Sequence, residues 1–182
     1  MSRIGKAPIK LAQGVEFKAE NGVITVKGPL GVLTQDYDVK NIGFNVENGE
    51  IVVTRFNEEN ATKAKHGLYR ALVNNMVIGV TAGYKKTLIV NGVGWKVTQN
   101  GKDLSLAVGL SHPVEVEEIE GITLEVPDNN TILVKGADKQ LVGAVAAKIK
   151  ATRPIEPYHG YGIRYTDEKV ILKAGKSASK KK

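Results

Sequence analysis

The sequence of 182 residues contains no cysteine. That absence excludes disulfides, thiolate metal sites and cysteine nucleophiles, and it fits a reducing compartment. Aromatic residues make up only 5% of the chain, so we expect a core built mainly from Val, Ile, Leu and Ala. No apolar run approaches the roughly 20 residues that span a bilayer, and no apolar signal core follows the N-terminal charges. We therefore expect a soluble, intracellular protein without a membrane segment.

The chain carries a net charge of +7, and the excess lies at one end. Residues 1–147 contain sixteen Lys and Arg against sixteen Asp and Glu, whereas residues 148–182 contain ten basic and three acidic residues. A neutral body with a basic end is typical of a protein with one region of contact to an anionic partner. The alternative is a basic tail that only increases solubility.

Asn-Gly pairs divide the chain into short apolar runs. Three of these pairs lie between two apolar segments that have the pattern of β-strands. Because an Asn-Gly pair favours the two-residue turn of a β-hairpin, each of the three predicts a hairpin. They are Asn21-Gly22, Asn48-Gly49 and Asn100-Gly101. The fourth pair, Asn91-Gly92, lies in a glycine-rich stretch and indicates either a bulge or a bend. A last strand is expected at Val170-Ile171-Leu172.

One helix is expected from about Glu58 to Ile78, with Asn57 as its N-cap and both glutamates in its first turn. Apolar residues recur there at spacings of three and four, which is typical of a helix with one buried face. The expected face consists of Ala61, Ala64, Leu68, Leu72 and Met76. His66 is expected at the surface or at its boundary.

A second helix is expected from about Lys139 to Ala151, with Asp138 as its cap. Pro154 cannot continue it because proline lacks the backbone donor that a helix interior needs. Its expected apolar face consists of Leu141, Val142, Val145 and Ile149.

Both expected helices follow β-hairpins, which indicates two copies of one unit. Aligning Gly67 with Gly143 also aligns Ala71 with Ala147, and such small residues would let each helix lie close to its sheet. The pattern predicts an α+β fold of two similar domains, each a mostly antiparallel or mixed sheet packed on one helix. The expected domains cover residues 1–81 and 82–173, followed by a basic flexible tail at 174–182.

Signatures of an enzyme are weak. Gly175-Lys176-Ser177 resembles the end of a phosphate loop, but Val170 stands where that loop needs a glycine. Metal-ligand spacing is absent from the three histidines, His66, His112 and His159. We therefore expect no catalytic residue, metal, cofactor or small-molecule substrate. An enzyme that recruits an anionic substrate through the basic end stays open as a third hypothesis.

The most informative stretch is residues 153–165. Its prolines keep the first half extended, and its glycines allow close approach of a bulky partner. Arginine offers forked donors to phosphate, while tyrosine can stack on bases. The alternative is an aromatic loop packed on its own domain. The combination of basic, aromatic and glycine residues in an irregular loop favours RNA binding by the C-terminal domain.

The residues expected to contact RNA lie in this stretch and in the basic segment after it. Arginine and lysine would bind phosphates, Tyr158, His159 and Tyr161 would stack or make polar contacts, and the glycines would permit close approach. The predicted set is Arg153, Pro154, Tyr158, His159, Gly160, Tyr161, Gly162, Arg164, Lys169, Lys173 and Lys176. The flexible lysines at the C-terminal end are expected to be auxiliary.

Several short motifs in a fixed order carry a family resemblance. They are Ser2-Arg3-Ile4-Gly5-Lys6, Val26-Lys27-Gly28-Pro29-Leu30-Gly31, Gly92-Val93-Gly94-Trp95-Lys96, Ser111-His112-Pro113-Val114, Asp138-Lys139-Gln140 and Glu156-Pro157-Tyr158-His159-Gly160-Tyr161-Gly162-Ile163-Arg164-Tyr165. Over essentially its full length the chain resembles the bacterial large-subunit ribosomal protein six family. Typical members have a proline at position 155 and lysines at 159 and 161. With Ile155, His159 and Tyr161 this loop has two fewer fixed positive charges.

The resemblance implies a non-catalytic protein of two similar α+β domains that binds 23S ribosomal RNA in the large (50S) subunit, chiefly through its C-terminal domain. It also implies a place near the base of the lateral stalk, close to the sarcin–ricin loop and the site of translational GTPases. Neighbouring large-subunit proteins would be further partners, and the location would be cytoplasmic, in the ribosome. A free RNA-binding or RNA-chaperone module is the alternative.

Overall fold

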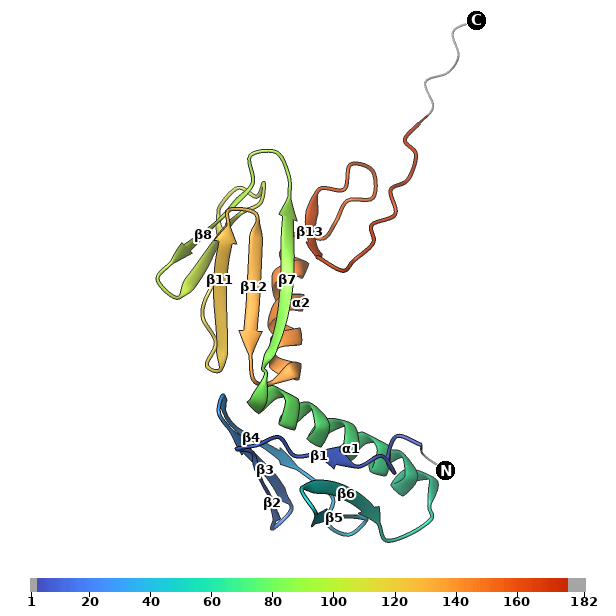
Figure 1. Ribbon diagram of the computed structural model, residues 1–182. Helices are drawn as coiled ribbons and strands as arrows, with labels where there is room; N and C mark the ends of the chain where they lie inside the picture. Colours follow the sequence, from blue (N-terminus) through green and yellow to red (C-terminus); the bar gives the residue numbers. More distant parts are fainter. Residues whose placement is uncertain (1–2, 177–182) are drawn as a thin grey trace, which may run out of the picture. The chain divides into compact units, whose positions relative to one another are not determined.

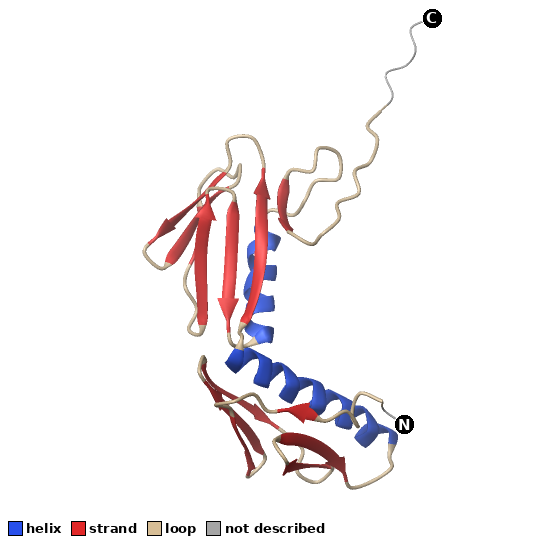
Figure 2. Ribbon diagram, in the orientation of Figure 1, coloured by secondary structure: helices blue, strands red, loops and turns tan. Residues whose placement is uncertain are grey.

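A computed structural model describes residues 3–176, so residues 177–182 of the expected tail lie outside the described part. The chain forms two compact units. The first unit comprises residues up to 84 together with 137–139, and the second comprises 85–136 and the residues from 140 onward. Each unit combines strands with one helix (Figures 1 and 2), which confirms the predicted α+β class with two similar domains. Neither helix is both long and apolar enough to cross a membrane.

The first unit contains two antiparallel sheets of three strands each, in the orders β2-β3-β4 and β1-β6-β5 (Figure 1). The strands are β1 (Ile9–Lys10), β2 (Glu16–Glu20), β3 (Val23–Gly28), β4 (Gly31–Asp36), β5 (Ile42–Glu47) and β6 (Glu50–Arg55). Asn21 and Asn48 both have a φ of 51°, and the glycines after them are also left-handed. These angles suit the two-residue hairpin turns predicted at both sites.

Helix α1 (Asn60–Thr81) begins later than predicted. Its N-cap residue is Glu59, which makes no side-chain capping bond, and no acidic residue lies in the first turn. The Asn57 side chain accepts a hydrogen bond from the Glu59 amide and donates one to Asn41 instead. Glu58 lies before the helix and pairs with Arg55 at 2.6 Å. The predicted cap was therefore wrong, because the Asn57 side chain bonds to Asn41 and to the Glu59 amide, and Glu58 bonds to Arg55 of β6, before the helix starts.

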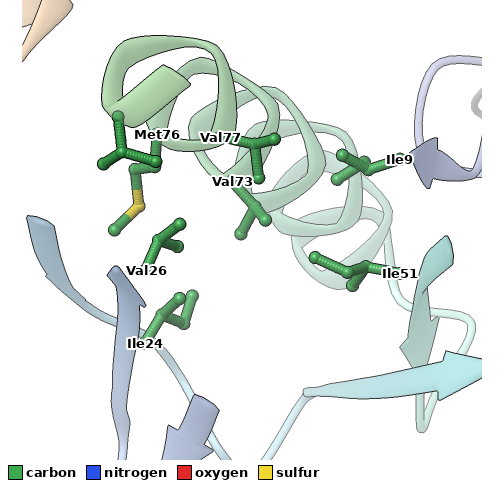
Figure 3. Close-up of a cluster of buried hydrophobic side chains, with 8 residues drawn as sticks. Ile9, Ile24, Val26, Ile51, Val73, Met76 and Val77 are labelled. Carbon is green, nitrogen blue, oxygen red and sulfur yellow. The ribbon is translucent and has the colours of Figure 1, made fainter. Parts of the chain in front are cut away.

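The buried face of α1 also differs from the prediction. Val73, Met76, Val77 and Val80 pack against Ile9, Ile24, Val26 and Ile51 from the sheets (Figure 3). Leu68, which was expected to be buried, is 53% exposed. The helix carries two overlapping apolar stripes, and the sheets cover the one that contains the β-branched valines.

His66 is buried, with 3% of its surface exposed, so its expected surface position was wrong. Its Nε2 lies 2.9 Å from the carbonyl oxygen of Val53 in β6. A side chain at Gly5 would clash with the imidazole ring, so the backbone at Gly5 lies directly against it. The N-terminal segment thus covers one face of this histidine.

The second unit contains a four-stranded sheet in the order β11-β12-β7-β13 and a three-stranded sheet in the order β10-β9-β8. The strands are β7 (Tyr84–Asn91), β8 (Lys96–Asn100), β9 (Asp103–Ala107), β10 (Val114–Val116), β11 (Ile122–Asp128), β12 (Thr131–Gly136) and β13 (Gly162–Tyr165). β8 and β9 pair antiparallel in a hairpin whose turn follows Asn100, the last residue of β8, at the Asn100-Gly101 pair where a hairpin was predicted.

Helix α2 (Lys139–Thr152) lies against one face of the four-stranded sheet (Figure 1). Val142, Val145 and Ile149 are buried, as their spacing predicted. For α2 the expected close approach to the sheet through Gly143 and Ala147 was wrong. A methyl group added at Gly143 would meet nothing within 4 Å, and Ala147 is exposed.

The last strand was predicted in the wrong place. β13 pairs antiparallel with β7, with Ile163 opposite Val90, whereas residues 170–172 form no strand. After β13 the Glu168 amide bonds back to the Tyr165 carbonyl in a turn. Ile171 consequently remains 80% exposed. Its β-propensity has no effect because the segment has no partner strand.

Candidate nucleic-acid interface

The loop of residues 153–161 connects α2 to β13 and is attached to the sheet at both of its ends. The Ile163 amide donates to the Arg153 carbonyl at 2.8 Å. The Asn91 side chain, at the end of β7, donates to the Gly160 carbonyl at 2.9 Å. The sheet edge therefore fixes where the loop projects (Figure 1).

Within the loop the backbone turns back on itself. The Glu156 amide donates to the Tyr161 carbonyl at 2.8 Å, and the Gly160 amide donates to the Glu156 carbonyl at 3.1 Å. Gly160 has a φ of 75° and Gly162 a φ of 145°, conformations that favour glycine. A methyl group at Gly162 would lie 2.5 Å from the Ile155 Cα. Both glycines are buried, so they shape the loop itself and present no open surface.

Three aromatic side chains neighbour one another, two on the loop of residues 153–161 and one, Trp95, just before β8. His159 and Tyr161 are stacked with centroids 5.6 Å apart, and Trp95 lies 6.5 Å from Tyr161. We call His159, Tyr161 and Trp95 the aromatic row. The guanidinium of Arg153 lies 5.6 Å from the centroid of Trp95, within reach of a cation–π interaction.

The predicted set of site residues did not include Trp95. Side chains at Gly92 or Gly109 would clash with its indole ring, so the glycine backbones of two loops hold it. The signal for it in the sequence was the single tryptophan inside Gly92-Val93-Gly94-Trp95-Lys96. That motif lies far from the basic end of the chain, and only the fold brings it beside Tyr161.

His159 is oriented by a carboxylate. Its Nδ1 lies 3.1 Å from both carboxylate oxygens of Glu156, and stacking on Tyr161 holds one face of the ring. The carboxylate of Glu156 is therefore engaged within the loop. The imidazole remains accessible, with 69% of its side chain exposed.

The segment after β13 folds back onto the loop. The Lys173 amide donates to the Pro157 carbonyl at 2.8 Å, and Leu172 lies against Gly160. The loop and this segment line a pocket of about 570 Å³ that is open to solvent. Its lining residues are Tyr158, His159, Ala174, Gly175 and Lys176.

Glu168 fixes the direction in which that segment leaves the sheet. Its carboxylate accepts hydrogen bonds from Lys150 of α2 at 2.6 Å and from the Tyr165 amide at 3.2 Å. The bond from Lys150 lowers the pKa of Glu168 below its usual value. Arg164 also donates to the Glu168 carbonyl, at 3.4 Å, and is half-buried.

The structure leaves most of the predicted set accessible. The exposed members are Arg153, Pro154, Tyr158, His159, Tyr161, Lys169, Lys173 and Lys176. The four cations among them form no ion pair with another residue of the described range. Lys169 does not line the pocket, whereas Lys176 does. Between residues 3 and 176 no cluster of His, Asp and Glu could hold a metal ion.

Comparison with known proteins identifies the family of the chain. The sequence pattern of the family described as ribosomal protein L6 matches the chain twice, over residues 12–83 and 91–166. The chain belongs to this family. The double match confirms the predicted internal repeat, and it confirms the resemblance read from the separate motifs.

Individual relatives align over nearly the whole chain. A large ribosomal subunit protein uL6 from Carboxydothermus hydrogenoformans is 51% identical over all of both chains. The uL6 protein from Caldicellulosiruptor saccharolyticus is 53% identical over 97% of each chain, and that from Fusobacterium nucleatum is 49% identical over 98% of this chain and 100% of its own. The chain is thus similar to these relatives in both units.

Proposed function

We propose that this chain is a structural, non-catalytic constituent of the large ribosomal subunit that binds 23S ribosomal RNA, mainly through its second unit. Family membership makes it a ribosomal protein, and the relatives bear the name of a large-subunit protein. Such a protein works in the cytoplasm, as part of the ribosome.

The observation that carries the RNA-binding proposal is that cations and aromatic rings lie together on the loop of residues 153–161 and on the segment that folds back onto it. Arg153 lies against the Trp95 ring, Lys176 lines the pocket with Tyr158 and His159, and Lys173 is bonded through its amide to Pro157 between them. All three cations are exposed and form no ion pair within the described residues. Phosphates attract such cations, while bases stack on such rings. A surface that served only for solubility would not need the ordered turn beneath these groups.

The proposed contacts divide by chemistry. Arg153, Lys169, Lys173 and Lys176 bind phosphates, while the aromatic row and Tyr158 contact bases or sugars. Arg164 contributes from the half-buried edge of the sheet, and Pro154 with the two buried glycines keeps the loop in shape. Consistent with the resemblance of the sequence, we place this surface near the stalk base and the translational GTPase site, beside other large-subunit proteins.

The first prediction concerns the salt dependence of RNA binding. If about five phosphates are neutralised, the slope of log K against log salt should be roughly −3.5 to −4.5. Replacing Arg153, Lys173 and Lys176 together by Gln should make that slope about 2 to 3 smaller in magnitude. Titration of 23S ribosomal RNA with the full chain at several salt concentrations measures the slope.

A matched control removes the same charge from the first unit. Lys10, Lys18 and Lys40 are exposed, and their replacement by Gln should leave the slope nearly unchanged. Equal slopes for the two triple variants, both folded by circular dichroism, would contradict the proposed surface. Retention of the wild-type chain in the large subunit through a moderate-salt gradient separates a ribosomal protein from a free RNA-binding module.

A further inference from the structure

We infer that the pocket beside the loop of residues 153–161 receives one unpaired, extruded nucleobase of the ribosomal RNA. The inference rests on the proposed function and deepens it. It means that the surface recognises a particular unstacked nucleotide in addition to backbone phosphates. The residues that line the pocket have the chemistry that a nucleobase and its phosphate require.

One wall is an aromatic ring that has no ring partner. Tyr158 is 52% exposed and lines the pocket, and no ring or cation contact is found for it within the described residues. The other five tyrosines each contact an aromatic ring or a lysine, as shown for Tyr37, Tyr69, Tyr84, Tyr161 and Tyr165. A half-exposed phenol ring on the wall of a pocket is a stacking surface for a base.

The remaining walls suit a nucleotide. The His159 ring is held by Glu156 at its Nδ1 and by stacking on Tyr161, so it lines the pocket in a fixed orientation. Ala174 and Gly175 present mainly backbone, whose amide and carbonyl groups can bond to the edge of a base. Lys176 supplies a positive charge for the attached phosphate, and no acidic side chain is among the described residues that line the pocket.

The two segments that line the pocket also contact each other in the protein alone. The bond between the Lys173 amide and the Pro157 carbonyl joins the two stretches, and Leu172 lies against Gly160. A continuous duplex cannot place a base in such a pocket because its bases are paired and stacked. The chemistry of the walls therefore points to a bulge or loop nucleotide, which is the usual target of specific RNA recognition.

The test uses large subunits that lack this protein and are reconstituted with the full chain or its variants. Hydroxyl radicals map the contact with the 23S RNA backbone, and base-specific reagents map accessible bases. We expect one unpaired base inside the backbone footprint to be protected by the wild type and by Tyr158→Phe. Tyr158→Ala should expose that base again and weaken binding roughly 5- to 150-fold, as the loss of one stacked base does.

A second variant tests the pocket without touching its ring. A methyl group at Gly175 would meet nothing within 4 Å, and this residue has no left-handed φ, so Gly175→Val should fold normally and fill the pocket. It should expose the same base while leaving the backbone footprint in place. Phe56→Ala is the control, because Phe56 is an exposed aromatic residue of the first unit.

The outcomes separate the two proposals. If the wild-type chain leaves no footprint on 23S RNA, the proposed function itself fails. If the footprint is present but Tyr158→Ala and Gly175→Val protect the same bases as the wild type, only the pocket inference is overturned. A footprint confined to paired nucleotides would overturn it as well.

Discussion

At the scale of single residues, glycine decides whether the candidate interface keeps its shape. Gly162 has a φ of 145°, and a methyl group there would lie 2.5 Å from the Ile155 Cα and 2.7 Å from the Pro154 carbonyl oxygen. Those neighbours are backbone atoms, which cannot move aside as a flexible side chain can. The loop can therefore close onto β13 only if position 162 carries no side chain.

We predict that Gly162→Ala destabilises the second unit by about 2 kcal/mol or more, since it combines a disfavoured φ with a backbone clash. Gly143→Ala is the matched control. It lies inside α2 with open space around it, so it should stabilise by about 0.5 to 1 kcal/mol. Urea unfolding followed by the fluorescence of the single tryptophan, Trp95, measures both. Equal effects of the two substitutions would contradict this explanation.

At the scale of elements, the sequence predicted what depends on local pattern. The three Asn-Gly hairpins and the face of α2 follow from turn chemistry and apolar spacing, and both were confirmed. The face of α1 and the last strand depend on which partner a segment meets, and both were mispredicted. For the same reason the sequence indicated the loop after α2 but not Trp95, which reaches Tyr161 only through the fold.

The turn after β13 provides a prediction at this scale. Glu168 joins α2 to that turn through Lys150, and its pKa is lowered by this bond. A carboxylate with a lowered pKa in the folded state stabilises that state above its ordinary pKa, and the contribution is lost as the pH falls through the folded value. Glu168→Gln should therefore reduce stability at pH 7, by at most about 1 kcal/mol for so accessible an ion pair.

The difference between wild type and Glu168→Gln should disappear at acidic pH, below the lowered pKa of Glu168, where the carboxylate is protonated in both folded and unfolded chains. Thermal unfolding at a series of pH values measures it. Asp167→Asn is the control, because Asp167 is 76% exposed and lies 3.7 Å from its lysine partner. A Glu168 effect that stayed constant over the whole pH range would argue against the ion pair as its cause.

At the scale of the whole molecule, charge and shape have separate roles in RNA binding. The net charge of +7 comes entirely from the last fifth of the chain, and three lysines of this excess lie at residues 180–182. Cations at a chain end attract RNA at long range, and salt screens that attraction. The pocket and the aromatic row act only at contact, where the identity of the nucleotide matters.

The two roles can be separated by deleting residues 177–182, which removes the three last lysines. We predict weaker binding to 23S RNA at low salt, with a slope smaller in magnitude by up to about 3, because up to three phosphate contacts are lost. The base protected at the pocket should stay protected once binding is saturated, because every lining residue is retained. Loss of that protection at saturation would mean that the terminal lysines take part in recognition as well as in attraction.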